Sequence, residues 1–468
     1  MFFGETPLRG ENMTDRDIRN AFSDCDDFVV RELNCRGKTL YAYAIDGLVS
    51  GADASEYILR PITDHLTGDT MDALYRNALS GQIYNSVANS CPDLDSVAMK
   101  LVNGFCVILF PEAGAIAFEV KTGEKRGISP PTVENTVKGP KDAFTETVRT
   151  NTSLIRRHLR TPQLRLYMTQ IGTNSLTNVT VAWIEGITSP ELVERMKQRL
   201  KDVAEQDWLT PSAVEESITG ARATPFPLLQ YTERADKFAQ GLLSGRVGVL
   251  VDGLPLGYLA PVDLGYFMYS PEDYGVDALS SSCILELRYG ALILSLLLPA
   301  FYIALTVFHQ EMIPLPLLRA IIEARQAVPF STITEVLALL LAFELLQEAG
   351  VHLPQSIGQS VSIIGGIVVG TAAVEASLIS PAALIVVSLA GICGFALPNR
   401  DFAEAVRLCR FALTLLAAAA GLFGICAGVL LLLIHLSGVN SLGEEYLAPF
   451  SRIEAPGILR RKQGGEDQ

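Results

Sequence analysis

The sequence predicts an N-terminal α/β region followed by a bundle of membrane-spanning helices. Charged residues make up only 19% of the 468 residues, against about 25% in soluble globular chains. Up to about residue 282 the charges occur throughout, whereas from Tyr289 to Ile434 they form short clusters between long apolar runs. The N-terminal part also contains an internal repeat. The chain is therefore expected to combine two related small α/β domains with a helical membrane domain.

These patterns divide the chain into five expected segments. They are a first soluble α/β domain at 1–125, a linker with a polar helix at 126–163, a second α/β domain at 164–282, a helical membrane domain at 283–440 and a C-terminal tail at 441–468.

The repeat joins segments about 140 residues apart. Apolar runs bounded by Gly, Pro and Asp are typical of β-hairpins. The strands 28–33 and 41–45 match 167–172 and 179–184, and the strands 105–110 and 115–120 match 246–251 and 256–261. Equal turn lengths and a preserved order favour duplication over coincidence. The stretch from Lys141 to Arg160 predicts a polar helix in the linker, which is either inert or a subunit contact.

Four uncharged stretches are long enough to cross a hydrocarbon core of about 30 Å. They are Tyr289–Phe308, Leu353–Val374, Ala376–Asn399 and Phe411–Ile434. Pro314, Pro316 and Pro329 prevent the stretch after the first of them from forming one regular helix, which favours an elbow or re-entrant arrangement.

The stretch 333–350 is shorter in its apolar core and carries Glu335 and Glu344. Because carboxylates are costly at mid-membrane, it predicts an amphipathic or re-entrant helix. If it does not span, four crossings return the C-terminus, with Arg460, Arg461 and Lys462, to the cytoplasm. If it does span, the loop with Arg400, Arg407 and Arg410 is cytoplasmic instead. Both arrangements agree with the positive-inside tendency.

Composition excludes several classes of function. A net charge of −14 argues against nucleic acid as a partner, and the eight cysteines and five histidines show no metal-ligand spacing. No Walker A loop, G-x-G-x-x-G, H-E-x-x-H or G-x-S-x-G occurs. We expect no enzyme activity, no catalytic residue, no cofactor and no metal. The N-terminus lacks a signal peptide, so the soluble region is expected to be cytoplasmic.

One predicted span carries a polar stripe. Gln359, Ser362, Gly366 and Gly370 recur at helical spacing, with Glu375 at the end of the run. Such a stripe either contacts neighbouring helices or lines an aqueous path between several copies, where a ring of carboxylates would attract cations.

Gly424 and Gly428 form a second small-residue pair, which predicts close helix packing within one subunit. It lies in the last of the predicted spans.

From about Lys138 to Phe450 the chain resembles the A subunit of the GerA family of spore germination receptors, which includes SpoVAF-like paralogues. The matching segments are Lys138–Glu146, Arg149–Asn151, Leu154–Arg157, Thr232–Arg234, Gly245–Gly253, Ser270–Tyr274, Phe308–Pro314, Glu348–Gly350, Ile357–Gln359, Ala372–Ala376 and Leu447–Phe450.

This resemblance implies a multi-pass protein of the spore inner membrane. It implies a homo-oligomer that works with a transporter-like B subunit and a lipoprotein C subunit, and that releases monovalent cations across the lipid bilayer when a nutrient germinant is sensed. The helix of Gln359, Ser362, Gly366 and Gly370 would then line the pore, with Glu375 at its mouth, while Glu335 and Glu344 would couple the 333–350 helix to gating.

The chain departs from the family pattern at Leu340, where a glutamate is usual, and at Ala235, His352 and Thr371. The missing carboxylate at Leu340 argues against carrying over charge-dependent gating through 333–350. A non-conducting scaffold for receptor clusters and a SpoVAF-like accessory channel are the alternatives. A secondary transporter is disfavoured because the membrane part shows no internal symmetry.

Overall fold

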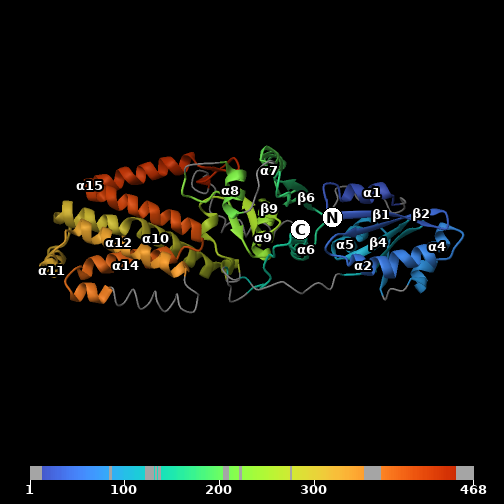
Figure 1. Ribbon diagram of the computed structural model, residues 1–468, viewed down its shortest axis with the longest axis horizontal. Helices are drawn as coiled ribbons and strands as arrows, with labels where there is room; N and C mark the ends of the chain where they lie inside the picture. The colour runs from blue at the N-terminus through green and yellow to red at the C-terminus, as the bar shows by residue number, and fades with distance from the viewer. Residues whose placement is uncertain are drawn as a thin grey trace. The chain divides into compact units, whose positions relative to one another are not determined.

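The computed structural model describes residues 13–83, 87–121, 131, 134, 139–203, 210–220, 224–274, 277–352 and 370–448. The chain forms two compact units (Figure 1), one of residues up to 222 with 229–261, the other of residues 223–228 with 262 onward. The predicted boundary at 282 is therefore wrong. Val262, Leu264 and Phe267 pack with Phe402 and Tyr446 of the helical unit, so the second unit begins about 20 residues earlier than charge patterning indicates.

The first repeat is an α/β domain of five strands. Its elements are α1 (Asp15–Ala21), β1 (Phe28–Cys35), β2 (Lys38–Ile45), α2 (Gly51–Ala54), η1 (Ser55–Leu59), α3 (Arg60–Asp64), α4 (Met71–Asn77), η2 (Ala78–Gln82), β3 (Ala88–Cys91), α5 (Leu94–Val102), β4 (Phe105–Phe110) and β5 (Gly114–Glu119).

The second repeat has the same plan. Its elements are α6 (Val148–His158), β6 (Leu164–Ile171), β7 (Thr177–Ile184), α7 (Pro190–Asp202), α8 (Pro211–Thr219), β8 (Gln230–Thr232), α9 (Ala235–Leu243), β9 (Val247–Val251) and β10 (Gly257–Ala260).

The two sheets have one topology. Their strand orders are β1-β2-β4-β5-β3 and β6-β7-β9-β10-β8, and every neighbouring pair is antiparallel. Equivalent turns also share backbone geometry: Gly47 and Gly186 have φ of 80° and 82°, and Gly104 and Gly245 have φ of 81° and 85°. The predicted duplication is confirmed, and these glycines lie in turns that require a positive φ.

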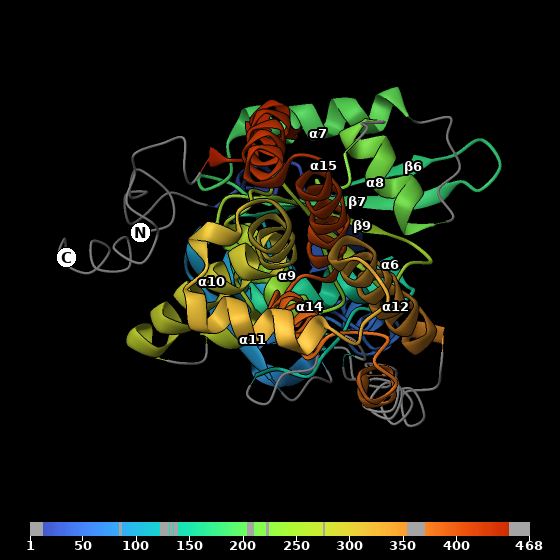
Figure 2. The ribbon, with the colours of Figure 1, turned by 90° about the vertical axis from the view of Figure 1, so that its left-hand side faces the viewer.

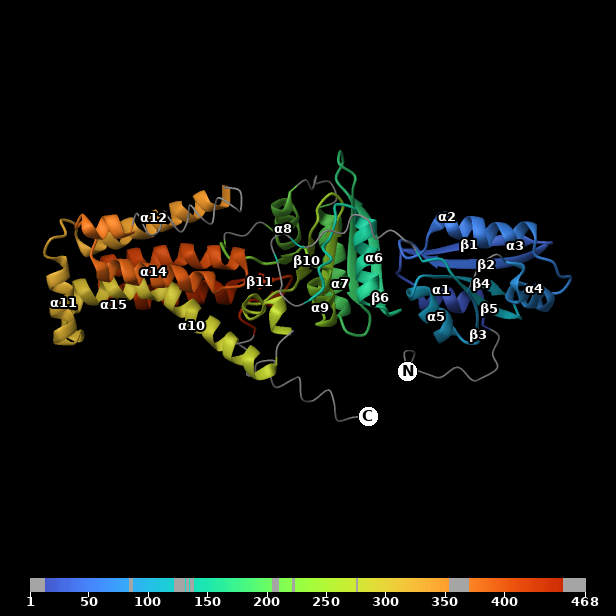
Figure 3. The same ribbon diagram turned by 90° about the horizontal axis from the view of Figure 1, so that it is seen from below.

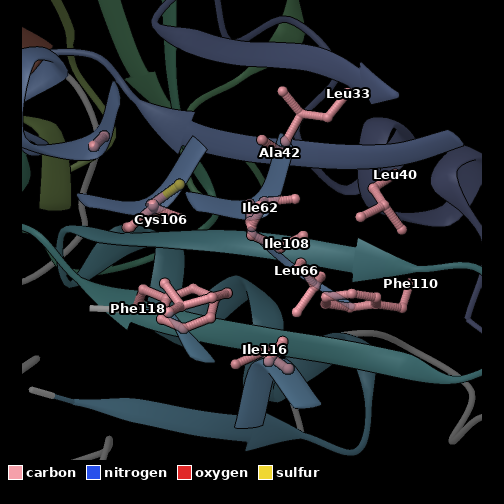
Figure 4. Close-up of a cluster of buried hydrophobic side chains, with 14 of the residues drawn as sticks. Leu33, Leu40, Ala42, Ile62, Leu66, Cys106, Ile108, Phe110, Ile116 and Phe118 are labelled. Carbon is pink, nitrogen blue, oxygen red and sulfur yellow. The ribbon is translucent and has the colours of Figure 1, made fainter. Parts of the chain in front are cut away.

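Helices cover both faces of the first sheet (Figure 3). On one face the strands pack against α2 to η2, and Figure 4 shows this cluster, which includes Ile62, Ile108, Phe110, Ile116 and Phe118. On the other face the strands pack against α1 and α5. Because β4 is buried on both faces, all six of its residues are buried, and it reads as a continuous apolar run rather than an alternating one.

The predicted linker helix is α6, and it belongs to the second repeat. Its Leu154 and Ile155 pack in the same core as Leu164 of β6 and Phe238 of α9. It holds the position that α1 holds in the first repeat, directly before the first hairpin. The interpretation of 141–160 as a linker is therefore wrong. The polar sequence suggests a solvated linker, but six consecutive residues, 151–156, are buried even though several of them are polar.

A buried ion pair joins the two repeats. Arg156 of α6 is completely buried and donates from Nε and Nη2 to the two carboxylate oxygens of Asp27, each at 2.8 Å. Arg156 also donates to the carbonyl oxygen of Leu164 at 3.0 Å. Arg165 donates to the carbonyl oxygen of Ala21 at 3.0 Å. Bidentate pairing satisfies the charge that burial would otherwise make costly.

The second repeat contains a histidine–carboxylate pair that predicts a pH dependence. His158 Nε2 lies 2.7 Å from Asp142 Oδ2. The hydrogen bond that His158 donates to Asp142 raises the pKa of His158 above 6.5, and the same hydrogen bond lowers the pKa of Asp142 below 3.8. A raised histidine pKa stabilises the fold below 6.5, and this is lost as pH rises through the folded pKa. A lowered carboxyl pKa stabilises the fold above 3.8, and this is lost as pH falls through the folded value.

We therefore expect the pair to stabilise the second repeat most between about pH 4 and 6.5. His158→Gln should lower the melting temperature at pH 6 but change it much less at pH 9. The exposed His65 provides the control: His65→Gln should cause no pH-dependent difference. Equal losses at both pH values for His158→Gln would contradict the ion pair.

The second unit is helical. Its elements are η3 (Tyr266–Met268), η4 (Pro271–Tyr274), α10 (Ala278–Ile303), η5 (Ala304–Phe308), η6 (Gln310–Met312), α11 (Leu315–Arg325), α12 (Thr332–His352), α14 (Pro381–Phe395), α15 (Arg400–Gly438), β11 (Asn440–Ser441) and β12 (Glu444–Glu445). Figure 2 shows α11 lying across the end of the bundle, while α10, α12, α14 and α15 are seen nearly end on. The prolines thus break the helix after α10, as expected.

Within the described ranges, two helices are long and apolar enough to cross a membrane: residues 278–308, of 31 residues, and α15, of 39 residues. The first contains the predicted span 289–308 but begins at Ala278, capped by Asp277. The predicted span 376–399 is shorter in the structure, since α14 covers 15 residues after a turn at Ser377 with φ 56°. Most of the predicted span 353–374 lies outside the described residues.

The predicted span 411–434 is not one rod. Gly421 in the middle of α15 has φ 62° and ψ −137°, outside helical geometry. Beyond it the chain returns, because a Cβ atom at Gly424 would overlap the carbonyl oxygen of Leu416, eight residues earlier. In a continuous helix that separation would be about 12 Å. α15 is thus a helical hairpin with two arms, 400–420 and 422–438. Hydropathy cannot detect this reversal, because the residues of 411–434 are apolar on both sides of Gly421.

The predicted tail from 441 begins inside the second unit. β11 and β12 form a short hairpin, and Tyr446 after it is completely buried against Phe226 and Phe267. An acidic residue before α10 also lies in the interior. Asp273 is buried and accepts hydrogen bonds from Arg288, with which it forms an internal ion pair.

Candidate functional site

The candidate site is the predicted polar stripe and the charged groups around α12. Gln359, Ser362 and Gly366 lie outside the described residues. Gly370 and Glu375 begin and end the described part of a helix, residues 370–375. Gly370 is buried, and a Cβ there would lie 3.4 Å from Leu384 of α14. Glu375 is exposed. The structure therefore places Gly370 against its own chain and Glu375 at a solvent-accessible helix end.

Glu335 of α12 is bound to the start of α14. It is 1% exposed, and one carboxylate oxygen accepts a hydrogen bond from the backbone N–H of Ser380. Ser380 is the N-cap of α14, its hydroxyl accepting from the N–H of Ala383. The N-terminus of a helix stabilises a negative charge, and the other oxygen of Glu335 lies 3.8 Å from Nε of Arg325. This arrangement explains how a carboxylate is tolerated at a buried position.

Glu344, two and a half turns further along α12, pairs with two arginines of α15. It accepts from Nη1 of Arg407 at 3.1 Å and from Nη2 of Arg410 at 2.9 Å. Arg410 is 2% exposed and also donates to the carbonyl oxygen of Ala390 at 3.4 Å. Arg407 has a further hydrogen bond to Gln347. One carboxylate thus neutralises part of a two-arginine cluster between α12 and α15.

The two carboxylates point to different faces of α12. Nine residues at 100° each leave them half a turn apart on the helix. Glu335 accordingly contacts α14 and α11, and Glu344 contacts α15. Movement of α12 would have to break or exchange both sets of polar contacts.

Glu344→Gln is expected to lower the melting temperature of the detergent-solubilised protein. The change leaves Arg410 buried without its counter-charge, at a cost of about 1–3 kcal/mol. Glu404 of α15 serves as the matched control, because its pairs with Arg400 and Arg407 lie at the surface, with a side chain 47% exposed. Glu404→Gln should cost less than about 1 kcal/mol. Equal effects of the two substitutions would contradict the buried pairing.

Sequence reasoning identified the two carboxylates but missed their partners. Arg407 and Arg410 were considered only as markers of membrane orientation, and Arg325 was not considered. A usable signal exists: the two arginines are three residues apart and therefore share one face of the first arm of α15. The structure also explains why an apolar residue is accommodated at Leu340, where the sequence pattern has a glutamate. This residue is buried in the core of α10, α12 and α14, with Val336 and Leu339.

The glycines of the predicted packing motif lie where the two arms of α15 meet. Gly424 faces the backbone at Leu416, and a Cβ at Gly428 would overlap the side chain of Leu413. The close contact is thus within one chain. Among the described residues, no group of three or more His, Cys, Asp or Glu side chains could hold a metal ion.

Large apolar side chains cover the outside of the helical unit. Leu287 of α10, Ile385 and Phe395 of α14, and Phe423 and Leu431 of α15 are 62–77% exposed. Exposed apolar surface of this extent marks contact with lipid or with other proteins. The fold and the site together define a protein with a duplicated α/β region and a helical unit suited to a membrane.

The comparisons with known proteins agree with this class. Residues 16–461 match the family described as Bacillus/Clostridium GerA spore germination protein, and the chain therefore belongs to the GerA family of spore germination proteins. The resemblance inferred from sequence motifs is confirmed.

Three similar proteins illustrate the membership. A membrane protein of Bacillus subtilis, YfkQ, is 37% identical over 442 residues, covering 93% of this chain and 86% of its own. Spore germination protein A1 of B. subtilis is 38% identical over 352 residues, covering 75% of this chain and 73% of its own. Spore germination protein GerLA of Bacillus cereus is 31% identical over 439 residues, covering 93% and 89%.

Among solved structures, the N-terminal domain of the A subunit of the Bacillus megaterium spore germinant receptor GerK3 is similar, with a TM-score of 0.41 and 23% identity. It covers 53% of this chain and 92% of that chain.

Proposed function

We propose that the protein is a subunit of a germinant-responsive receptor that releases monovalent cations across the spore inner membrane. Copies of the chain assemble around an axis, and the helix with Gln359, Ser362 and Gly366 lines the path, whereas Gly370 packs against α14 of its own chain. The N-terminal repeats lie on the cytoplasmic side, and transporter-like and lipoprotein subunits act as partners. No step of this function requires an enzyme activity or a cofactor.

The polar stripe at 359–370 is the observation that carries the proposal. It combines hydrophilic or small residues on one helix face with an uncharged stretch long enough to cross a bilayer. Two further features support it. Glu375, at the end of this helix, is exposed, where a ring of carboxylates would attract cations. The turn that follows is held by Glu335 through Ser380, so α12 is coupled to the pore helix.

Glu335 and Glu344 act in this proposal as coupling residues. A displacement of α15 would pull Glu344 through Arg407 and Arg410 and would reach Ser380 through Glu335. Such a mechanism needs two alternative sets of polar contacts for α12, one in the closed state and one in the open state. It does not need the helices to deform continuously.

A potassium-efflux assay with Gly366→Leu tests the proposal. Protein reconstituted in potassium-loaded liposomes with its partner subunits should lose most of its germinant-stimulated efflux, because the larger side chain obstructs the path. Spores that carry the substitution should germinate more slowly.

Gly290 of α10 provides the matched control, because a Cβ there meets open space. Gly290→Leu should leave efflux unchanged. Normal efflux with Gly366→Leu would remove this helix from the path. Oligomers that never conduct, alone or with their partners, would instead favour the scaffold.

A further inference from the structure

The two repeats contact each other through two different surfaces, one on each repeat. Each repeat also has a copy of the surface that the other uses, and these two copies are exposed. The first repeat contributes two loops, residues 25–27 and 46–47, which we call the docking loops. They contact α6 and the first residues of β6, which we call the docking face. Because the repeats are copies, each repeat has both features. Repeat 1 also has a docking face, formed by α1 and β1, and repeat 2 also has docking loops, at 161–163 and 185–187.

Two backbone hydrogen bonds fix the equivalence of the loops. The N–H of Asp46 donates to the carbonyl oxygen of Asp27 at 2.8 Å, and the N–H of Glu185 donates to that of Gln163 at 2.9 Å. The docking loops of the two repeats are therefore held together in the same way, with Glu185 in the position of Asp46.

The helix ends fix the equivalence of the faces. α1 has its C-cap at Phe22 and α6 at Leu159. Four residues before each cap stands a fully buried isoleucine, Ile18 or Ile155. Arg19 and Arg156 both lie three residues before the cap and are therefore equivalent. Arg16 and Ser153 both lie six residues before it.

The docking face on α6 and β6 is buried, whereas its copy on α1 and β1 is exposed. On α6 and β6, Ser153 is 4%, Arg156 0% and Arg165 6% exposed. On α1 and β1, the equivalent Arg16 and Arg19 are exposed, and the equivalent Val29 is 49% exposed.

The docking loops differ in the same way. A Cβ at Gly47 would lie 3.1 Å from Cβ of Ser153, whereas a Cβ at Gly186 would have no atom within 4 Å. Ile187 beside it is 51% exposed. The loop that faces another repeat is covered, and its copy is not.

The two exposed surfaces keep part of the charge pattern of the occupied contact. Within the chain, acidic loop residues meet arginines of α6: Asp27 binds Arg156, and Asp46 binds Arg149 at 2.6 Å. The exposed loop keeps an acid at Glu185, whose side chain is 59% exposed and accepts hydrogen bonds from Arg165 of its own repeat. The exposed face keeps Arg19, whose present bond to Asp15 is a surface pair with a side chain 44% exposed. Surface pairs of this kind are worth little and can exchange.

We propose that a second copy of this chain occupies the α1–β1 face. The 185–187 loop of one copy docks on the α1–β1 face of the next, repeating between chains the contact that exists within the chain. The contact is head-to-tail, since each copy uses a different surface on either side. Contacts of this kind form a ring where the rotation between copies closes and an open filament where it does not. The inference rests on the proposed homo-oligomer and identifies the surface that orders it.

Cross-linking of the full-length protein in membranes tests this surface. The variant Arg16→Cys with Ile187→Cys is treated with a short bis-maleimide, and the products are separated by mass. The expected result is a ladder that extends beyond the dimer, because every chain carries both positions. Each single variant measures the background from the exposed native Cys283 and Cys426.

Arg16→Cys with Thr173→Cys is the matched control, because Thr173 is exposed in the turn at the far end of β6. A ladder no stronger than this control, with the oligomer intact in native gels, would overturn the surface and leave the proposed function standing. Dimers without higher bands would overturn the head-to-tail arrangement. Monomeric protein in the membrane would overturn the surface and the proposed function together.

A variant expected to strengthen the contact tests which residues of the two copies face each other. Gln163 stands where Asp27 stands in the occupied contact, so Gln163→Asp should offer Arg19 of the next copy the carboxylate that Asp27 offers Arg156. The ladder should become about two- to fivefold stronger at low salt, the range of an exposed ion pair. Arg19→Gln should abolish this gain. An unchanged ladder with Gln163→Asp would contradict the register.

Discussion

Gly424→Leu is expected to prevent folding of the α15 hairpin. The arms of this hairpin approach so closely at Gly424 that a Cβ would overlap the carbonyl oxygen of Leu416. A backbone oxygen cannot rotate away as a side chain can, so the arms must separate. We expect a loss of more than about 3 kcal/mol, beyond the usual range for overpacking of a core. The protein should be recovered from membranes in low yield and melt early in detergent.

Gly424→Ala should already destabilise the hairpin, because its Cβ alone causes the overlap. Gly290→Ala in α10 is the matched control: it lies in a helix and its Cβ meets open space. Alanine favours helices over glycine by about 0.5–1 kcal/mol, so this control should be neutral or slightly stabilising. A fully stable Gly424→Ala protein would contradict the reversal at Gly421.

Asp27→Asn is expected to uncouple the two α/β repeats. It removes the charge that balances Arg156, which is completely buried. Removing one partner of a buried ion pair costs about 3–5 kcal/mol. Limited proteolysis of the full-length protein should show cleavage between residues 122 and 147 at lower protease concentrations than in the parent protein.

The double variant Asp27→Leu with Arg156→Met separates charge from packing. Replacing both partners by apolar groups leaves no buried charge, so it should cost much less than Asp27→Asn alone. Asp46→Asn is the surface control, since the pair of Asp46 with Arg149 has side chains 39% and 62% exposed. A double variant as unstable as the single one would show that the site depends on shape rather than charge.

Strand and turn chemistry made the duplicated region predictable. Each strand pair is an apolar run bounded by glycine, proline or an acidic residue, and the copies at Phe105–Phe110 and Val247–Val251 both lie in buried central strands. Local signals suffice where a segment's own pattern dictates its conformation. The identical strand orders then follow from the shared sequence order of the elements.

The tertiary features were not predictable from local pattern. The reversal of α15 depends on one glycine, Gly421, within a stretch whose hydropathy is uniform. The burial of Arg156 depends on Asp27, which is 129 residues away. Glu344 was recognised as unusual in an apolar stretch, but its partners Arg407 and Arg410 come from a different helix. A charge in an apolar stretch indicates that a partner exists, and only the fold shows which one.

The most direct test of the central claim is cysteine accessibility along 353–374 in conducting membranes. The account predicts that a water-soluble thiol reagent blocks current in the Gln359→Cys and Ser362→Cys proteins. The Ile364→Cys and Val368→Cys proteins, whose cysteines lie on the opposite face of the helix, should not be blocked. Uniform protection of all four positions in a protein that still conducts would contradict a path lined by this helix.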